Sequence, residues 1–102
     1  MKKTPTLKIT EKAFQGTVIK ALKLAGYSYY HTFNSMRSVK GFPDLIAANP
    51  TKRHVMAIEL KSETGKVTEE QSQWLTELSL CGIDSVVLRP SQFDEWWERI
   101  KP

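Results

Sequence analysis

The sequence predicts an α/β fold in which helices flank a mixed β-sheet, with elements in the order α-β-β-β-α-β-α. Segments with apolar residues every three or four positions alternate with short β-prone segments of period two. Three strand-like segments come before the second helix, and this order favours antiparallel, hairpin-like pairing in the middle of the chain. The last of these strands, the second helix and the next strand form a strand–helix–strand unit, which favours a parallel pair. The 102 residues are enough for a single domain.

A basic arm and an amphipathic helix are expected at the start of the chain. Residues 1–9 contain three lysines and no periodic pattern. Thr10 is suited to cap a helix over about residues 11–25, because its hydroxyl can accept a hydrogen bond from the first turn. Apolar residues at helical spacing share one face of this helix: Phe14, Val18, Ala21, Leu22 and Ala25.

Three strands are predicted in the middle of the chain. The first covers the aromatic residues 27–34, and the second is the short apolar run 44–48, which follows a proline. A turn at Asn49 and Pro50 leads to the third, residues 54–61. Its alternation places Glu59 and Lys61 on one face, with Met56, Ile58 and Leu60 on the other.

A helix, a strand and a helix complete the predicted fold. Thr68 and Gln71 have the spacing of a capping box, and the helix they begin extends to about Cys81. Residues 84–89 form a strand. Ser91 is expected to cap a last helix within residues 90–102. The aromatic face of this helix favours packing into the core, and a subunit interface is the alternative.

Composition and charge limit the kinds of protein that this chain can be. The chain has 40% hydrophobic and 25% charged residues and no apolar run long enough to span a membrane. One cysteine, Cys81, excludes an internal disulfide, and we expect it to be a buried thiol in an intracellular protein, cytoplasmic or nucleoid-associated. Residues 1–57 carry ten basic and two acidic side chains, whereas residues 58–102 carry five and nine. The excess of basic residues in the first half suggests a polyanionic partner. The alternative is that these charges only keep the protein soluble.

Three charged residues lie where charge is costly. Asp44 begins a buried strand, Glu59 lies in the most apolar strand, and Lys61 shares the face of Glu59. Two carboxylates on neighbouring strands can hold a hard cation such as Mg²⁺, and a lysine beside them can stabilise charge on a phosphate. A salt bridge at a strand end is the alternative for Glu59 and Lys61 alone.

These residues also match a known signature. Pro43-Asp44, followed by Glu59-Leu60-Lys61, resembles the PD-(D/E)xK motif of the restriction-endonuclease-like superfamily. Four correctly spaced strings resemble the virus-type replication-repair nuclease (VRR-NUC) domain more closely: GFPDLI at 41–46, IELK at 58–61, GKVTEEQ at 65–71 and WL at 74–75. The resemblance covers about residues 10–89 and implies a restriction-endonuclease-like core.

The resemblance implies roles for individual residues. Asp44 and Glu59 correspond to metal ligands and Lys61 to the catalytic lysine, while Gln71 is expected to face the active site. Glu11, four residues before Gln15, matches a helix glutamate of the family and is a candidate third metal ligand. The alternatives are a pure capping role for Gln71 and a helix-dipole role for Glu11.

Contacts to nucleic acid are expected from the loops around this site. Arg37, Lys40 and Lys66 are the candidate phosphate-binding residues, with generic surface lysines as the alternative. The aromatic residues of the first strand either stack on unpaired bases or pack in the core or an interface: Tyr27, Tyr29, Tyr30 and Phe33.

The resemblance implies a Mg²⁺- or Mn²⁺-dependent DNA endonuclease that acts on branched DNA such as Holliday junctions. One chain offers one active site, whereas symmetric cuts in a four-way junction need two, so a homodimer is expected. The alternative is a DNA-binding module that has lost catalysis. An RNA-binding protein is a third possibility, although no RNA-binding motif supports it.

Overall fold

The structure, a computed structural model, describes residues 9–33 and 39–102. It confirms the predicted order of elements, with one short 3₁₀ turn added before the last helix. The elements are α1 (Glu11–Leu24), β1 (Ser28–His31), β2 (Leu45–Asn49), β3 (His54–Leu60), α2 (Glu69–Leu80), β4 (Asp84–Leu88), η1 (Pro90–Gln92) and α3 (Phe93–Ile100). None of the helices in these residues combines the length and hydrophobicity needed to cross a bilayer.

The four strands form one mixed sheet in the order β1-β2-β3-β4. β1 pairs with β2, and β2 with β3, in antiparallel fashion, whereas β3 and β4 are parallel. Leu45 lies opposite Ile58, and Ile58 lies beside Val86. The α2 crossover between β3 and β4 makes the parallel pair possible, because parallel neighbours cannot be joined by a tight turn.

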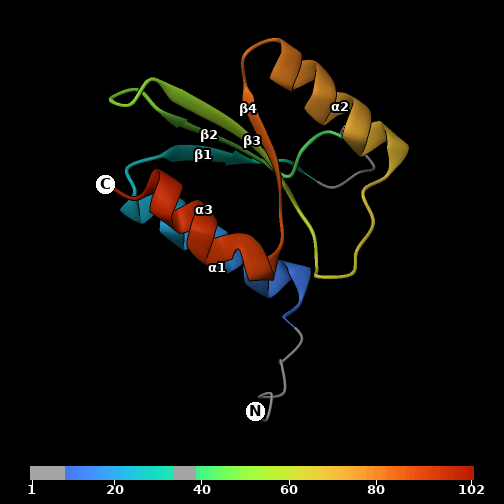
Figure 1. The fold of residues 1–102 in the computed structure, drawn as a ribbon, viewed down its shortest axis with the longest axis horizontal. Coiled ribbons are helices and arrows are strands. Elements are labelled where there is room, and N and C mark those ends of the chain that lie inside the picture. Colours follow the sequence, from blue (N-terminus) through green and yellow to red (C-terminus); the bar gives the residue numbers. More distant parts are fainter. Residues whose placement is uncertain (1–8, 34–38) are drawn as a thin grey trace.

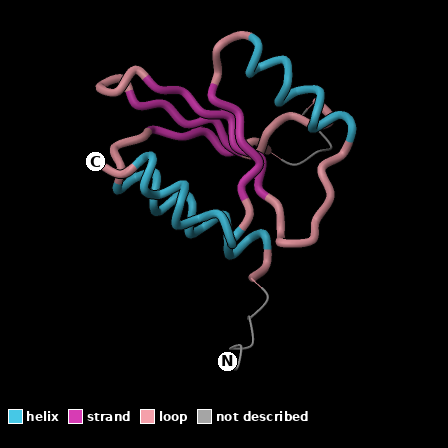
Figure 2. Tube along the Cα trace, in the orientation of Figure 1, coloured by secondary structure: helices cyan, strands magenta, loops and turns pink. Residues whose placement is uncertain are grey.

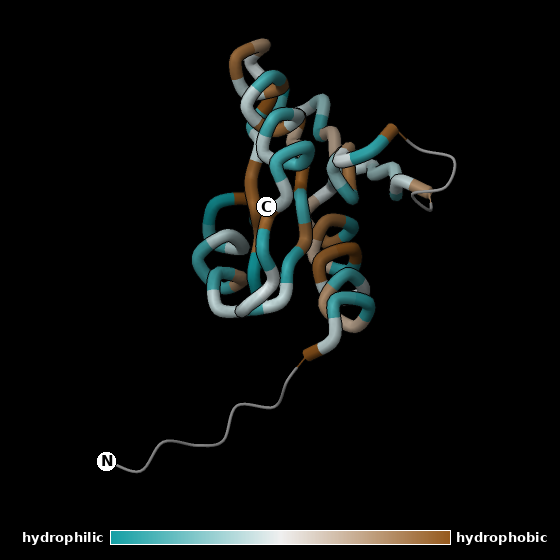
Figure 3. Tube along the Cα trace, turned by 90° about the vertical axis from the view of Figure 1, so that its right-hand side faces the viewer, coloured by the Kyte–Doolittle hydropathy of each residue, from teal (hydrophilic) through white to brown (hydrophobic). Residues whose placement is uncertain are grey.

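Helices cover both faces of the sheet, but unequally. α1 and α3 lie side by side on one face, and α2 lies on the other, next to β4 (Figures 1 and 2). The core fills the space between the sheet and the α1–α3 layer, where Leu45, Met56 and Ile58 are fully buried. In Figure 3 apolar stretches recur along the strands and helices that enclose this core.

The face beneath α2 is only partly covered. α2 packs on β3 and β4 and buries none of its own residues completely. On the same face of the sheet, Tyr30 of β1 and Val55 of β3 remain exposed. Among the described residues, this face is therefore open to solvent at Tyr30 and Val55.

The last helix packs into the core, as the main interpretation predicts. Trp96 and Ile100 are 3% and 1% exposed, and both belong to the core cluster. The predicted cap at Ser91 is wrong. Pro90 starts the 3₁₀ turn, so α3 begins two residues after Ser91, at Phe93.

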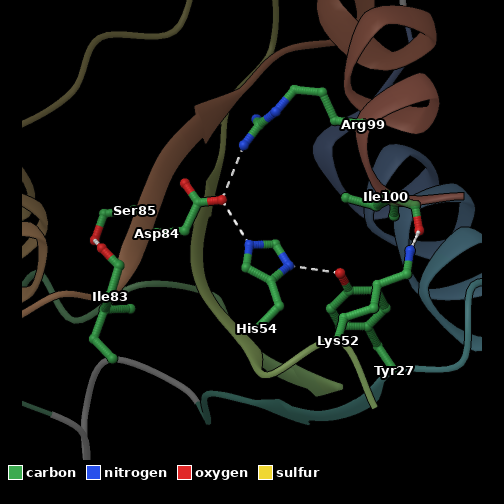
Figure 4. A network of polar contacts seen from close by, with 8 residues as sticks. All are labelled: Tyr27, Lys52, His54, Ile83, Asp84, Ser85, Arg99 and Ile100. Atoms are coloured by element: carbon green, nitrogen blue, oxygen red, sulfur yellow. Dashed lines mark hydrogen bonds and ion pairs between the residues drawn. The ribbon is translucent and has the colours of Figure 1, made fainter. Parts of the chain in front are cut away.

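A polar network fastens α3 to the end of the sheet where β3 and β4 begin (Figure 4). His54 lies between the Tyr27 hydroxyl, 2.6 Å from its Nδ1, and Asp84 Oδ2, 2.8 Å from its Nε2. Arg99 of α3 donates to the same Asp84 oxygen at 2.9 Å. Lys52 donates to the carbonyl oxygen of Ile100 at 2.6 Å. These residues therefore have a structural role at the end of β3 opposite Glu59.

Two further expectations are corrected. β1 is shorter than the predicted strand 27–34. Tyr27 precedes β1 and is buried, with its hydroxyl in the polar network, and Asn34 lies outside the described residues. Cys81 is exposed, so the expectation of a buried thiol is wrong. It is the C-terminal cap of α2, three residues before β4 begins.

Candidate active site

The strand register brings Asp44 and Glu59 together. Leu45 is paired with Ile58, so Asp44, which immediately precedes β2, comes beside Glu59 on the neighbouring strand. A hydrogen bond fixes this position, because the backbone N–H of Leu60 donates to Asp44 Oδ2 at 2.8 Å. The two predicted carboxylates thus lie on the face of the sheet that α2 partly covers.

The carboxyl group of Glu59 is buried beside another acid. Glu59 is 2% exposed, and its Oε1 has no hydrogen-bond partner among the described residues. Lys61 Nζ lies 3.7 Å from the other oxygen, Oε2. Burial raises the pKa of Glu59 to about 8, with the negative charge of Asp44 adding to the rise and Lys61 opposing it.

This arrangement suits a divalent cation. An unpartnered buried oxygen beside a second carboxylate offers the oxygen ligands that Mg²⁺ and Mn²⁺ prefer, and a cation would remove the repulsion between the two acids. In the described part of the chain two carboxylates lie side by side here, and no cluster of three potential ligands occurs. Mg²⁺ is commonly held by one or two carboxylates plus waters and phosphate oxygens, so the residues present fit it.

Glu11 lies near this site without joining the carboxylate pair. It is the exposed first residue of α1, and its negative charge makes a small contribution to the raised pKa of Glu59. The structure therefore places Glu11 within electrostatic range of the site. Its role as a third metal ligand stays a prediction.

The turn that carries Asp44 is held from two sides. Gly41 has φ +86°, and a Cβ there would lie 2.6 Å from backbone and side-chain atoms of Glu70 in the first turn of α2. Phe42 packs edge-on against Trp74, with ring centroids 4.9 Å apart. Thr32, which directly follows β1, donates its backbone N–H to the Asp44 carbonyl and its hydroxyl to the Pro43 carbonyl, at 2.9 and 2.6 Å.

The loop after Lys61 is held by a residue that sequence reasoning missed. Arg89 Nη1 donates to the carbonyl oxygens of Ser62 and Gly65, both at 2.7 Å. Glu63 in the same loop accepts from the backbone N–H of Ser91 at 2.6 Å. Arg89 directly follows β4, beside the end of β3, and a lone arginine after a strand gives no sequence signal for such a contact.

Gln71 takes the capping role that its spacing with Thr68 predicts. The Gln71 N–H donates to Thr68 Oγ1 at 3.1 Å, and Gln71 Oε1 accepts from the Thr68 N–H at 2.9 Å. The side chain is half-buried at the start of α2. A catalytic contribution from Gln71 remains a prediction, because its amide nitrogen takes no part in the capping box.

Two of the three predicted phosphate-binding residues, Lys40 and Lys66, lie near the first turn of α2. Lys40 forms an exposed ion pair with Glu70 at 3.6 Å. Lys66 is exposed and precedes the cap residue Thr68 by two positions. Arg37 lies outside the described residues. Their contact with nucleic acid stays a prediction.

The mixed sheet, with a Pro-Asp turn, a buried glutamate and a lysine at one end, places the chain in the restriction-endonuclease-like fold class. Comparison with protein families narrows this class. The sequence pattern of the VRR-NUC domain matches residues 10–92. The chain therefore belongs to the VRR-NUC family, as the sequence motifs predict.

The comparison with solved structures agrees on the fold. One similar structure is that of Archaeoglobus fulgidus Hjc, "a Holliday junction resolvase from an archaeal hyperthermophile", with a TM-score of 0.57 and 23% sequence identity. The match covers 76% of this chain and 66% of the resolvase chain. The search of curated proteins gave no match.

The raised pKa of Glu59 predicts an unusual pH dependence of stability. Folded Glu59 titrates at about pH 8 and unfolded Glu59 near 4.5, so the folded state holds an extra proton between these values. We expect the free energy of unfolding of the metal-free protein to fall as pH rises from about 5 to 8. Urea unfolding in EDTA at both pH values measures this change.

Glu59→Gln is expected to reduce this fall in stability, because glutamine does not titrate. The exposed Glu77→Gln serves as the control and should retain the wild-type pH dependence. An unchanged pH dependence in the Glu59 variant would contradict the assignment of the raised pKa.

Gly41→Ala tests the close contact between the Pro-Asp turn and α2. Alanine adds a Cβ that overlaps the Glu70 backbone and forces a side chain into the left-handed region. We expect a loss of stability of about 1–3 kcal/mol, measured by urea denaturation. Gly16→Ala is the matched control, because a Cβ at this exposed helical position meets nothing within 4 Å. Equal effects of the two substitutions would contradict the contact.

Proposed function

We propose that the protein is a metal-dependent endonuclease that hydrolyses phosphodiester bonds in DNA. The single observation that carries this proposal is the buried Glu59 carboxyl group, paired with Asp44 and flanked by Lys61. Membership of the VRR-NUC family supports the same activity. A structural ion pair does not explain why the buried Glu59 carboxyl group is held beside a second carboxylate.

Each residue of the site has a distinct part in this chemistry. Asp44 and Glu59 would hold Mg²⁺ or Mn²⁺, which when bound supplies charge neutralisation and activates a water nucleophile. Glu59 must lose its proton to serve as a ligand, and the nearby ammonium group of Lys61 favours that ionised form. Lys61 Nζ also provides a positive charge for the phosphate oxygens as negative charge builds on them.

We propose branched DNA, such as a four-way junction, as the substrate and a homodimer as the active form. The similar fold of a structure named as a Holliday junction resolvase supports this substrate class. The described residues contain one such carboxylate pair, and two symmetric cuts in a junction require two sites. Lys40 and Lys66, near the first turn of α2, are the proposed phosphate contacts.

The central test is cleavage of a four-way junction and of a linear duplex, with Mg²⁺, with Mn²⁺ and with EDTA. We expect metal-dependent cutting of the junction as paired symmetric nicks. Asp44→Ala, Glu59→Ala and Lys61→Ala should each lower the rate by roughly 100-fold or more, since each removes a charged group that the reaction needs.

The exposed Asp94→Asn, on α3, is the control and should retain wild-type activity. Cutting that survives all three alanine substitutions would refute the residue assignment. Salt-dependent binding of DNA without products under any metal condition would identify a catalytically inactive binding module instead.

Two substitutions of Gln71 separate capping from catalysis. Gln71→Glu keeps an acceptor for the Thr68 N–H, and so keeps the capping box, whereas Gln71→Ala removes it and is expected to cost about 1 kcal/mol of stability. If the amide acts in catalysis, both variants lose activity, measured as the single-turnover cleavage rate at a temperature where both stay folded. Full activity of Gln71→Glu would limit Gln71 to the helix cap.

A further inference from the structure

The exposed aromatic residues of β1 occupy an edge strand. β1 pairs only with β2 in the described structure, so its other edge has no neighbouring strand there. All four of its residues are exposed, including Tyr29 and Tyr30. Large aromatic side chains at an open sheet edge are costly in water and are typical of surfaces that bind a partner.

The tyrosines of this region differ in what they contact. Tyr27 is buried in the polar network beside His54. Tyr29 is 37% exposed and lies beneath the ammonium group of Lys23, which is 5.8 Å from the ring centroid. Tyr30 is 59% exposed. The ring of Tyr30 is therefore the tyrosine surface most open to a ligand.

The strand register places Tyr30 on the same face of the sheet as the two carboxylates. Tyr30 is opposite Ile46 of β2, and Ile46 is opposite Ala57 of β3. Asp44 and Glu59 are each two residues further along these strands, so all these side chains project to one face. Tyr29, one residue away, projects to the opposite face, toward α1.

Tyr30 is also close to the carboxylates along the strand. Thr32, two residues after Tyr30, hydrogen-bonds to the carbonyl oxygens of Pro43 and Asp44. Two residues of an extended strand span about 7 Å. A DNA strand with a phosphate at Asp44 therefore has a neighbouring nucleotide within reach of the Tyr30 ring.

The surroundings favour a polyanion over a second apolar surface. Between residues 9 and 57, the described residues carry six basic side chains and two acidic ones, Glu11 and Asp44. On the face that Tyr30 shares, Lys61 lies 3.7 Å from Glu59, and Lys40 is exposed beside the first turn of α2. Open aromatic rings beside positive charge are the combination by which proteins bind single-stranded nucleic acid.

We propose that Tyr30 stacks on an unpaired base next to the phosphate held at the carboxylate site. This inference rests on the proposed nuclease function and deepens it. Preference for branched DNA then arises in part at Tyr30, because base stacking is interrupted at a branch point, so a base there unpairs and turns outward at a lower cost than in a continuous duplex. Phe33, 77% exposed three residues further on, extends the same exposed aromatic run.

The test measures binding without cleavage. The probe is a four-way junction with 2-aminopurine at the branch point, titrated with protein in EDTA, where metal-dependent hydrolysis does not occur. Wild-type protein should quench the fluorescence of the probe as the base stacks on the tyrosine ring. Tyr30→Ala should weaken junction binding roughly tenfold and remove the quenching, with little change in duplex binding.

Two variants serve as controls. Tyr30→Phe keeps an aromatic ring and should retain both affinity and quenching. Tyr29→Ala removes the same residue type from the opposite face of the same strand and should leave both unchanged. Sedimentation velocity of each variant, without DNA, reports its oligomeric state.

Each alternative outcome has a distinct meaning. Equal losses from Tyr29→Ala and Tyr30→Ala, or no loss from Tyr30→Ala, would overturn the inference while leaving the nuclease proposal intact. A Tyr30→Ala protein that changes from dimer to monomer would show that a second copy of the chain covers this surface, which also overturns it. Tyr30-dependent quenching in a protein that never cuts DNA would support stacking and refute the nuclease function.

Discussion

The carboxyl group of Glu59 lies in the protein interior beside a second acid, and one of its oxygens has no partner among the described residues. Such burial costs free energy that a protein recovers only by protonation, by pairing or by binding a cation. Lys61 provides part of this compensation, and its Nζ remains 3.7 Å from the carboxylate. The site is therefore incomplete until a proton or a metal ion neutralises the remaining charge.

The surrounding structure keeps the two acids together despite their repulsion. The β2–β3 register and the Leu60 N–H fix Asp44, while the contact of Gly41 with α2 fixes the turn before it. Arg89 fixes the loop that follows Lys61. At the other end of β3, the His54–Asp84 network binds α3 to the sheet. The strand that carries Glu59 is thus constrained at both ends, as a preorganised site requires.

Sequence patterns predict most of the strands and helices, because these elements depend on interactions between residues that are close along the chain. The alternation in residues 54–61 predicts β3, and the Thr68–Gln71 spacing predicts the cap of α2, since both depend on neighbours along the chain. The motif spacing also predicts that Asp44, Glu59 and Lys61 lie close together, as they do. The hydrogen bonds from Arg89 to the loop after Lys61 and the exposure of Cys81 depend on elements distant in sequence. No local pattern predicts them. The 3₁₀ turn at Pro90 likewise displaces the predicted start of α3.

The proposed function requires Asp44 and Glu59 to hold a divalent cation together. The most direct measurement is an anomalous difference map from crystals grown with Mn²⁺. We expect a strong peak beside the carboxyl groups of Asp44 and Glu59. A map without a peak at this position, at a Mn²⁺ concentration that supports DNA cleavage, would contradict the claim.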